Sequence, residues 1–176
     1  MFDDLVLDYG LLHPLSAEEL RDLNRSLSDF EEETGYELAP YILTAGFLET
    51  LRFRAGDWAG TGDDFNLWQT LWGIVCDGSI LIGFLFFSGP PNARGAVGLS
   101  WSINAEWIDS PLFESAVKGC RNWAFGNDEC RRMEIESEDA DPGLPASMLR
   151  RCGFAMESRT EPQHWAATKA VEGRLL

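Results

Sequence analysis

The sequence predicts an α/β (α+β) fold in which helices flank a mixed sheet. Strand-like and helix-like segments follow one another in the order βαα–βββ–α–β–α–ββ, which indicates a layered arrangement of sheet and helices. The chain has 176 residues, of which 45% are hydrophobic. That length allows one domain with a real core and is too short for two ordinary ones. We therefore expect residues 1–176 to form a single domain.

The first third of the chain carries one strand signal and two helix signals. Leu5 to Leu15 is apolar and predicts a first strand. Ser16 and Glu19 form a capping box at the start of the helix that follows. Further along we expect a solvated acidic turn at 28–37, a second helix at 40–56 and a loop at 57–66.

The middle of the chain is rich in strand signals. Asp77 and Gly78 separate two apolar runs and are a strong hairpin signal. Gly153 is expected to follow the last helix as its C′ residue. The other expected elements are a strand at 96–104, a helix at 113–125, a strand at 130–139, a turn at 140–145, a helix at 146–152 and a terminal hairpin at 154–170.

Charge and composition exclude several classes of partner. The formal net charge is −15, which argues against binding a nucleic-acid backbone or an anionic membrane and suits a cationic or amine-bearing partner. The longest apolar run, Ile80 to Phe87, is far shorter than the ~20 residues that span a bilayer. The seven tryptophans are compatible with a homodimer patch as well as with an ordinary core.

Cysteine and histidine usage predicts neither disulfides nor a metal centre. The four cysteines contain no C-x-x-C pair, and the acidic N-terminus lacks a secretory signal, so we expect reduced thiols in a cytoplasmic protein. His13 and His164 lie far apart and give no metal-ligand spacing with the cysteines, so no metal site is expected.

The connection "INAEWIDSPLFESA" (residues 103–116) joins a strand to the N-terminus of a helix. Such a junction is a common anion site, because free backbone N–H groups and the helix dipole both face the ligand. Anion sites of this kind usually contain glycines and a basic residue. Here Asp109, Pro111 and Phe113 stand in their place, and the residues alone leave open whether the connection binds a ligand.

An ordered set of short motifs resembles the GNAT N-acetyltransferase superfamily, especially its RimJ/RimL-like branch. "LWGIVCDGSILIG" is similar to that family's W-x-I-x-x-x-G-x-x-I-G hairpin, and "NAEW" to the N-P-E-[YW] that ends its central strand. "RNWAF" and "MLRRCGF" resemble two later motifs, so that the resemblance extends from about Leu67 to Trp165. It implies a twisted mixed sheet that splays open at its central strand, with acetyl-CoA in the splay. The activity it implies is direct attack on the thioester by a primary amine, from a small molecule or a protein N-terminus.

The same register implies where a cofactor loop would lie, and the chemistry of that loop is altered. The loop's basic or amide position falls on Ile108, and its two small positions fall on Pro111 and Phe113. Pro111 removes a backbone donor, Phe113 adds bulk, and Asp109 adds negative charge beside an expected dianion. The implied cofactor-binding positions are Ile103, Asn104, Ile108, Asp109, Ser110, Pro111, Leu112, Phe113 and Glu114.

The catalytic positions that the resemblance implies are also changed. Many relatives carry a Glu on the central strand, where this chain has Gly98. A relative's N-x-x-S pattern falls on Pro142 and Pro145, and the tyrosine that some relatives use as an acid falls on Leu149.

Two residues are the principal catalytic candidates, and each has a plain structural alternative. Glu106 is a candidate base and Ser147 a candidate donor to the leaving thiolate, although both also suit an exposed surface. Other candidates are Cys152, His164 and the carboxylates of Glu134, Glu136 and Glu138, which alternate along one strand and share a face. The cations that would attract phosphates are Lys118, Arg121, Arg150 and Arg151.

Two functions of different classes therefore remain. The first is an acetyl-CoA-dependent N-acetyltransferase. The second is a non-catalytic GNAT-like binding module that has lost the acetyl-CoA chemistry while keeping the hydrophobic scaffold.

Overall fold

The structure is a computed structural model of the chain, and it describes residues 3–40, 42–44, 46–49, 51–52, 66–137, 146–158 and 163–170. Its strands are β1 (Leu5–Leu7), β2 (Gly10–Pro14), β3 (Glu37–Leu38), β4 (Leu71–Cys76), β5 (Ile80–Phe87), β6 (Ala96–Ile103), β7 (Arg132–Ser137), β8 (Ala155–Ser158) and β9 (Gln163–Thr168). Its helices are α1 (Ala17–Arg25), α2 (Leu27–Thr34), α4 (Pro111–Gly126) and α5 (Ala146–Arg151), with a 3-10 turn at Ala105–Trp107. Residues 46–49 and 51–52 are also helical. The expected loop at 57–65 and turn at 140–145 lie outside the described residues.

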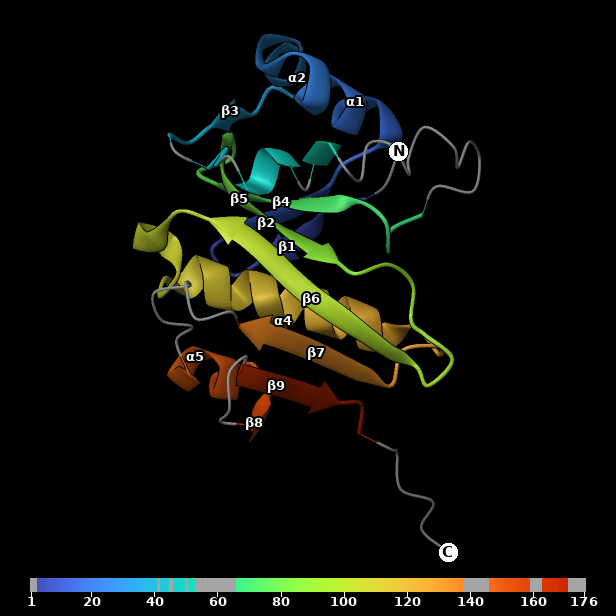
Figure 1. Cartoon of the computed structure of the whole chain (residues 1–176). Coiled ribbons are helices and arrows are strands. Elements are labelled where there is room, and N and C mark those ends of the chain that lie inside the picture. The colour runs from blue at the N-terminus through green and yellow to red at the C-terminus, as the bar shows by residue number, and fades with distance from the viewer. Residues whose placement is uncertain are drawn as a thin grey trace, which may run out of the picture.

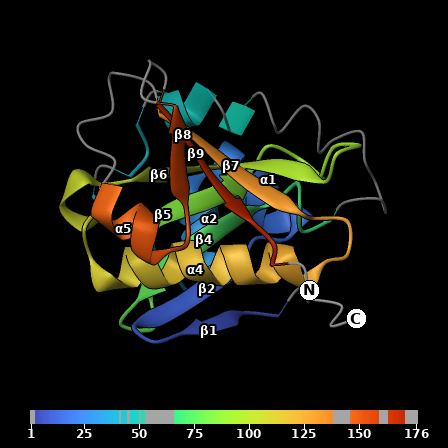
Figure 2. The ribbon, with the colours of Figure 1, turned by 90° about the horizontal axis from the view of Figure 1, so that it is seen from below.

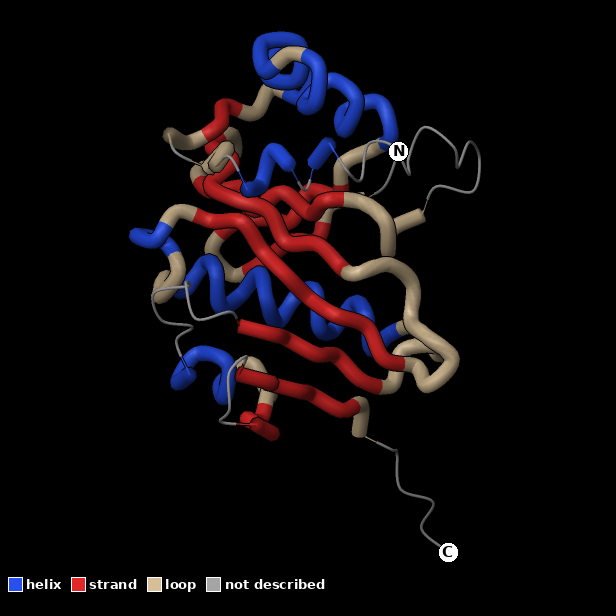
Figure 3. Tube along the Cα trace, in the orientation of Figure 1, coloured by secondary structure: helices blue, strands red, loops and turns tan. Residues whose placement is uncertain are grey.

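The strands form one mixed sheet in the order β1-β2-β4-β5-β6-β7-β9-β8, with β3 added in parallel to β5 (Figures 1 and 3). All neighbours on the main path are antiparallel except β6 and β7, which run parallel. The long crossover between these two strands contains α4, as a parallel pair requires. The expectation of a mixed sheet flanked by helices is confirmed.

The sheet divides along β6. The first residues of β6, Ala96 to Gly98, pair with Arg132 to Glu134 of β7. From Leu99 to Ile103, β6 pairs with β5 instead. The second halves of β6 and β7 therefore diverge, and the predicted splay at the central strand is present.

Two hydrophobic clusters hold the layers together. On one face, α4 and α5 pack against alternate residues of β6 and β7, such as Val97, Leu99 and Met133. On the other face, α1 and α2 pack against β4 and β5, with Phe84 fully buried. Figures 1 and 2 show α4 crossing behind β6 and β7, with α5 beside it and α1 and α2 at the opposite side of the sheet.

Local sequence signals account for most element boundaries. Ser16 and Glu19 form the expected capping box. Asp77 and Gly78 both have positive φ, as a two-residue hairpin turn requires. Gly153 has φ +84° after α5, as expected for a C′ glycine.

Two expectations for the first third of the chain are wrong. Leu5 to Leu15 is not one strand, because the chain turns at residues 8–9 and forms the β1–β2 hairpin. The acidic stretch 28–37 is not a turn, because most of it forms α2. Ser26 caps α2, Phe30 is buried on its inner face, and Gly35 ends it in the left-handed conformation. Among the described residues, none of the helices has the length and apolar character that crossing a membrane requires.

Candidate functional site

A cavity of about 490 Å³ lies where β6 and β7 begin to diverge. It is on the face of the sheet opposite α4, because its β6 residues Gly98 and Ser100 alternate with Val97 and Leu99, which pack toward α4. The residues that line it are Ser88, Pro90, Asn92, Ala96, Val97, Gly98, Leu99, Ser100, Glu134 and Glu136. The cavity therefore combines a strand edge, two hydroxyl groups and two carboxylates.

The two carboxylates in this cavity have different partners. Glu134 accepts a hydrogen bond of 2.7 Å from Nε of Arg132, which also binds Glu157. Glu136 lies in the diverging half of β7, and its Oε1 is 3.4 Å from Nε2 of His164, the residue opposite it on β9. The Glu136 side chain is 62% exposed, compared with 38% for Glu134. Glu136 is thus the carboxylate more available to a ligand.

Gly98 lines this cavity at the point where the pairing of β6 with β7 ends. It is the last β6 residue paired with β7, and a Cβ at this position would come within 3.2 Å of the Ser88 hydroxyl oxygen. Gly98 has no side chain, so the carboxylates of the cavity come from Glu134 and Glu136 on the neighbouring strand. Glu138, the third acidic residue in the predicted series, lies outside the described residues.

The two principal catalytic candidates lie elsewhere. Glu106 is exposed in the 3-10 turn after β6, and its carboxylate accepts a 3.2 Å hydrogen bond from the side chain of Asn104. Ser147 is exposed on α5, which packs on the sheet face opposite the cavity. Neither residue is among those that line the cavity in the described structure.

The first turn of α4 satisfies most of its own backbone donors. Ser110 is the N-cap, and its hydroxyl accepts the N–H of Phe113 at 3.1 Å while its carbonyl accepts that of Glu114. Pro111 occupies the first helical position and has no N–H. In the preceding turn, the N–H groups of Trp107, Ile108 and Ser110 each donate to the carbonyl oxygen three residues earlier.

The hydrophobic residues of this connection are part of the core. Phe113 is fully buried, and its ring packs edge-on against Trp101 with centroids 5.5 Å apart. The bulk that Phe113 was expected to add near a phosphate is directed into the core. Leu112 is also buried, while Ile103 and Ile108 are half-buried against the same cluster. Asp109 is exposed, as its charge requires.

The four cations that were candidates for binding phosphate all have partners within the protein. Lys118 and Arg151 both bind the carboxylate of Glu114, at 2.7 Å and 2.8 Å. These contacts, that of Arg151 first, hold the pKa of Glu114 below its ordinary value. Arg121 donates to the carbonyl of Cys152, and the Arg150 guanidinium lies 5.6 Å from the centre of the Trp165 ring.

Cys152 is a buried structural cysteine. It is inaccessible to solvent, and its thiol contacts Met148 and the carbonyl of Glu114. Burial raises the pKa of its thiol to about 11. The thiol therefore stays protonated near neutral pH and is not a nucleophile.

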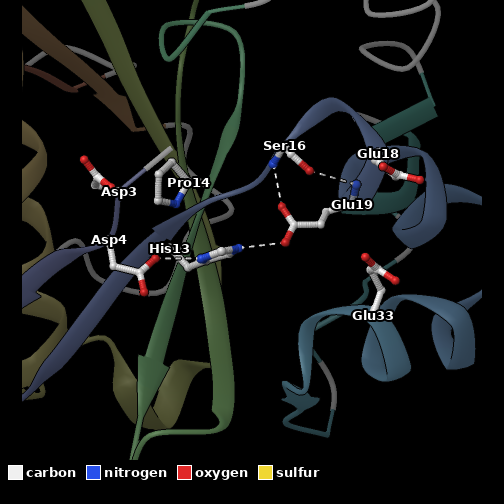
Figure 4. A pocket seen from close by; sticks show the side chains of 8 residues that line it. All are labelled: Asp3, Asp4, His13, Pro14, Ser16, Glu18, Glu19 and Glu33. Carbon is white, nitrogen blue, oxygen red and sulfur yellow. Dashed lines mark hydrogen bonds and ion pairs between the residues drawn. The ribbon is translucent and has the colours of Figure 1, made fainter. Parts of the chain in front are cut away.

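A second cavity, of about 450 Å³, surrounds His13 and is strongly acidic. Figure 4 shows the imidazole between two carboxylates, with Nδ1 2.7 Å from Asp4 and Nε2 3.1 Å from Glu19. The Tyr36 ring packs edge-on against the imidazole. The remaining residues that line this cavity are Asp3, Pro14, Ser16, Glu18 and Glu33.

The electrostatics of His13 and Glu19 are coupled. Burial alone would lower the pKa of His13, but its contacts with Glu19 and Asp4 outweigh burial and raise it. Burial would raise the pKa of Glu19, but His13 and the backbone and hydroxyl of Ser16 lower it to about 2. Both effects favour an imidazolium ion between two carboxylates.

Neither set of contacts could be predicted from the sequence alone. His13 and its partners lie nine and six residues apart, and they meet only because the β1–β2 hairpin turns back toward α1. The pairing of Glu136 with His164 depends on the register of β7 with β9. The alternation of carboxylates along β7 was the one usable signal. The described residues contain no group of three or more His, Cys, Asp or Glu side chains arranged to hold a metal ion.

Comparisons with known proteins identify the fold. No protein-family model and no curated protein sequence matches this chain. Solved structures of GNAT acetyltransferases do match it over nearly the whole length. A GNAT-family acetyltransferase from Bacillus anthracis is 12% identical, with 95% of this chain and 99% of that chain covered and a TM-score of 0.57.

Two ribosomal-protein acetyltransferases give similar values. RimL, an acetyltransferase of ribosomal protein L7/L12 solved with coenzyme A, is 13% identical, with coverage of 94% and 98% and a TM-score of 0.61. The ribosomal-protein-S5-alanine acetyltransferase from Vibrio fischeri is 11% identical, with coverage of 96% and 97% and a TM-score of 0.63.

The residues present suit one part of coenzyme A and not another. From Leu99 to Ile103, the edge of β6 that faces β7 has no strand partner among the described residues, so its backbone groups suit the amides of an extended pantetheine arm. The first turn of α4 does not suit a diphosphate, because its donors and its flanking cations are already bound. The splayed sheet, the α4 crossover and the solved structures that match them show that this protein has the GNAT acetyltransferase fold.

Proposed function

We propose that this protein is an N-acyltransferase of the GNAT type, which transfers an acetyl group from a thioester to a primary amine. The observation that carries the proposal is the cavity at the splay, which places Glu136 and Ser100 on two diverging strands. An acyl group that enters along the β6 edge would reach an amine held in this cavity. The balanced reaction forms the amide N–C bond, breaks the thioester C–S bond, and transfers one amine proton to the leaving thiolate, which becomes a thiol.

The carboxylates define the class of acceptor. A primary amine is protonated near neutral pH, and two carboxylates in a half-open cavity attract such a cation. Arg132 already balances Glu134. Glu136 is therefore the residue that would take the proton from the ammonium group, because its neighbour His164 is 3.4 Å away and contacts only one of its oxygens. The acceptor would be a small amine or a protein N-terminus.

Acetyl-CoA is the donor to test first, and the protein's own contribution would be orientation. The unpaired β6 edge would hold the pantetheine amides, and the apolar side of the splay would exclude water from the thioester. Glu106 and Ser147 are not needed in this arrangement.

The decisive experiment is an acetylation assay over a panel of amines, with Glu136→Gln and Glu134→Gln compared. Loss of a general base lowers kcat/KM by about 10²-fold, so Glu136→Gln should lose that much. Glu134→Gln should lose less than about tenfold, because Glu134 acts through charge alone. Glu129→Gln, an exposed change near the far end of α4, is the matched control and should retain wild-type activity. Equal losses in both cavity variants and the control would contradict the role of Glu136.

A second function is favoured by the closed first turn of α4. In that case the protein is a GNAT-like module that binds an amine-bearing ligand in the same cavity without acetyl transfer. Calorimetry separates the two. Saturable binding of acetyl-CoA together with turnover of any amine supports the enzyme. Amine binding that Glu136→Gln weakens, without any acetylation above a heat-killed control, supports the module.

A further inference from the structure

We propose that the first turn of α4 is a self-occupied anion site, in which Glu114 takes the place that a phosphate group would need. The protein would consequently gain no affinity from the diphosphate of a nucleotide-bearing donor. The fold matches that of an acetyltransferase solved with coenzyme A, whereas this turn does not suit a diphosphate. The contacts responsible for that mismatch can each be tested.

The start of α4 has few backbone N–H groups free to bind an anion. The N–H groups of a helix's first turn normally point outward without partners and are what an anion binds. At the start of α4 the Ser110 N–H donates to the Trp107 carbonyl, the Phe113 N–H donates to the Ser110 hydroxyl, and Pro111 has none. Of the four residues from Ser110 to Phe113, only Leu112 keeps an N–H for which the described structure shows no acceptor. One donor cannot replace the several that a diphosphate requires.

The two cations beside the first turn of α4 already bind an internal carboxylate. Lys118 lies one turn along α4, and Arg151 comes from the end of α5, so that both flank the first turn. Glu114 accepts from Lys118 with one carboxylate oxygen and from Nε and Nη2 of Arg151 with the other, at 2.7 to 2.9 Å. The Glu114 side chain is 18% exposed, whereas those of Lys118 and Arg151 are 41% and 54% exposed. Both cations are therefore engaged by the same internal carboxylate, which offsets one of their two positive charges.

The ion pairs of Glu114 lie between two helices. Glu114 ties the first turn of α4 to the last residue of α5, and the Cys152 thiol contacts the Glu114 carbonyl in the same region. Figure 2 shows α5 beside the N-terminal half of α4. The exposed carboxylate of Asp109 adds further negative charge in front of this turn. A diphosphate would have to displace Glu114 and would meet like charge as it did so.

The first test uses inorganic pyrophosphate and does not depend on the proposed function. Backbone amide NMR of the wild-type chain should show no saturable shift of residues 109–114 on titration with pyrophosphate. Glu114→Gln keeps the side-chain shape and frees Lys118 and Arg151, so pyrophosphate affinity should rise at least about tenfold. The double variant Glu114→Gln with Arg151→Gln should lose that gain, and Glu129→Gln should behave as wild type.

Two results of this titration would overturn the inference. One is saturable binding of pyrophosphate to wild-type residues 109–114. The other is a folded Glu114→Gln variant that gains no affinity. If thermal melting shows that this variant is unfolded, Glu114→Ala serves as the second variant with the same expectation.

The second test concerns the donor and rests on the proposed function. If the arm alone is recognised, acetyl-CoA and acetyl-pantetheine should bind wild type with dissociation constants within about threefold of each other, which is less than 0.7 kcal/mol. Acetyl-CoA binding more than about tenfold tighter would overturn the inference. Failure of both donors to bind would remove the proposed function, whereas the pyrophosphate result would still decide the inference.

Discussion

Replacing His13 with glutamine should make the stability of this protein less dependent on pH. The imidazole lies between Asp4 and Glu19, with one ring nitrogen facing each carboxylate. A neutral imidazole has one N–H and can donate to only one of them, whereas imidazolium donates to both. The geometry therefore requires the proton, and His13→Gln removes the charge while keeping a single donor group.

The size of the effect follows from the pKa of Glu19. A fall from 4.5 to about 2 corresponds to about 3 kcal/mol of stabilisation of the carboxylate, at 1.36 kcal/mol for each pKa unit. The backbone and hydroxyl of Ser16 supply part of that fall, and the His13 and Glu19 side chains are still 15% and 17% exposed. We therefore expect His13→Gln to lower the free energy of unfolding by about 1–2 kcal/mol at pH 5.5.

The sign of the pH dependence is fixed by the direction of each shift. The folded-state pKa of His13 is raised above 6.5, so its contribution is complete below pH 6.5 and is lost as pH rises through the folded pKa. The folded-state pKa of Glu19 is lowered, so its contribution is present above about pH 4.5 and is lost as pH falls toward 2. The difference between wild type and variant should thus be largest between about pH 4.5 and 6.5.

Urea unfolding at pH 5.5, 7 and 9 measures this difference directly. His164→Gln is the matched control, because His164 is 39% exposed and approaches a single carboxylate at 3.4 Å. That variant should change the free energy of unfolding by less than about 0.5 kcal/mol at each pH. A difference between wild type and His13→Gln that stays constant from pH 5.5 to 9 would refute the reasoning.

Three further outcomes can be checked with simple measurements. Phe113→Ala should lower the free energy of unfolding by about 3–5 kcal/mol, because the ring is fully buried against Trp101. Urea unfolding would measure this loss, with Phe113→Leu as a milder comparison. A loss under about 1 kcal/mol would disprove the packing argument. Gly153→Ala should cost about 1–2 kcal/mol, because φ is +84° and a Cβ would collide with the Arg121 guanidinium; an unchanged melting temperature would exclude this. Cys152 and the other three buried cysteines should resist a thiol reagent at pH 8 until the protein is unfolded, since burial raises the pKa of each thiol. Rapid labelling of the native protein would contradict this expectation.

The parts of the fold that were predictable are those with local causes. The hairpin at Asp77-Gly78, the capping box of α1 and the glycine after α5 each depend on residues within one or two turns. The α2 helix was missed because its acidic composition suggested a solvated turn. Its own signals, an N-cap at Ser26, a buried Phe30 and a left-handed Gly35, are local too and were sufficient to find it.

The site was predictable only in part, because its partners come from distant segments. Alternation along β7 places Glu134 and Glu136 on one face, but pairing with β6 decides that this face meets the splay. The altered chemistry expected of the anion loop rests on Pro111 and Asp109, which the sequence shows directly. The role proposed for Glu114 could not be foreseen, because its partner Arg151 lies 37 residues away.

The division of the sheet at β6 has a mechanical consequence. Among the described residues, backbone hydrogen bonding joins the strands before α4 to those after it through three register pairs, Ala96 to Gly98 with Arg132 to Glu134. The neighbouring Gly95 carbonyl also accepts from the N–H groups of Arg131 and Arg132. The remaining cohesion between the two halves is side-chain packing around α4. The two halves of the sheet are therefore joined by a short backbone seam, and separating them there would break few backbone hydrogen bonds. Any molecule that fills the splay would contact both halves of the sheet and would oppose their separation. Occupancy of the site and rigidity of the whole sheet should therefore rise together.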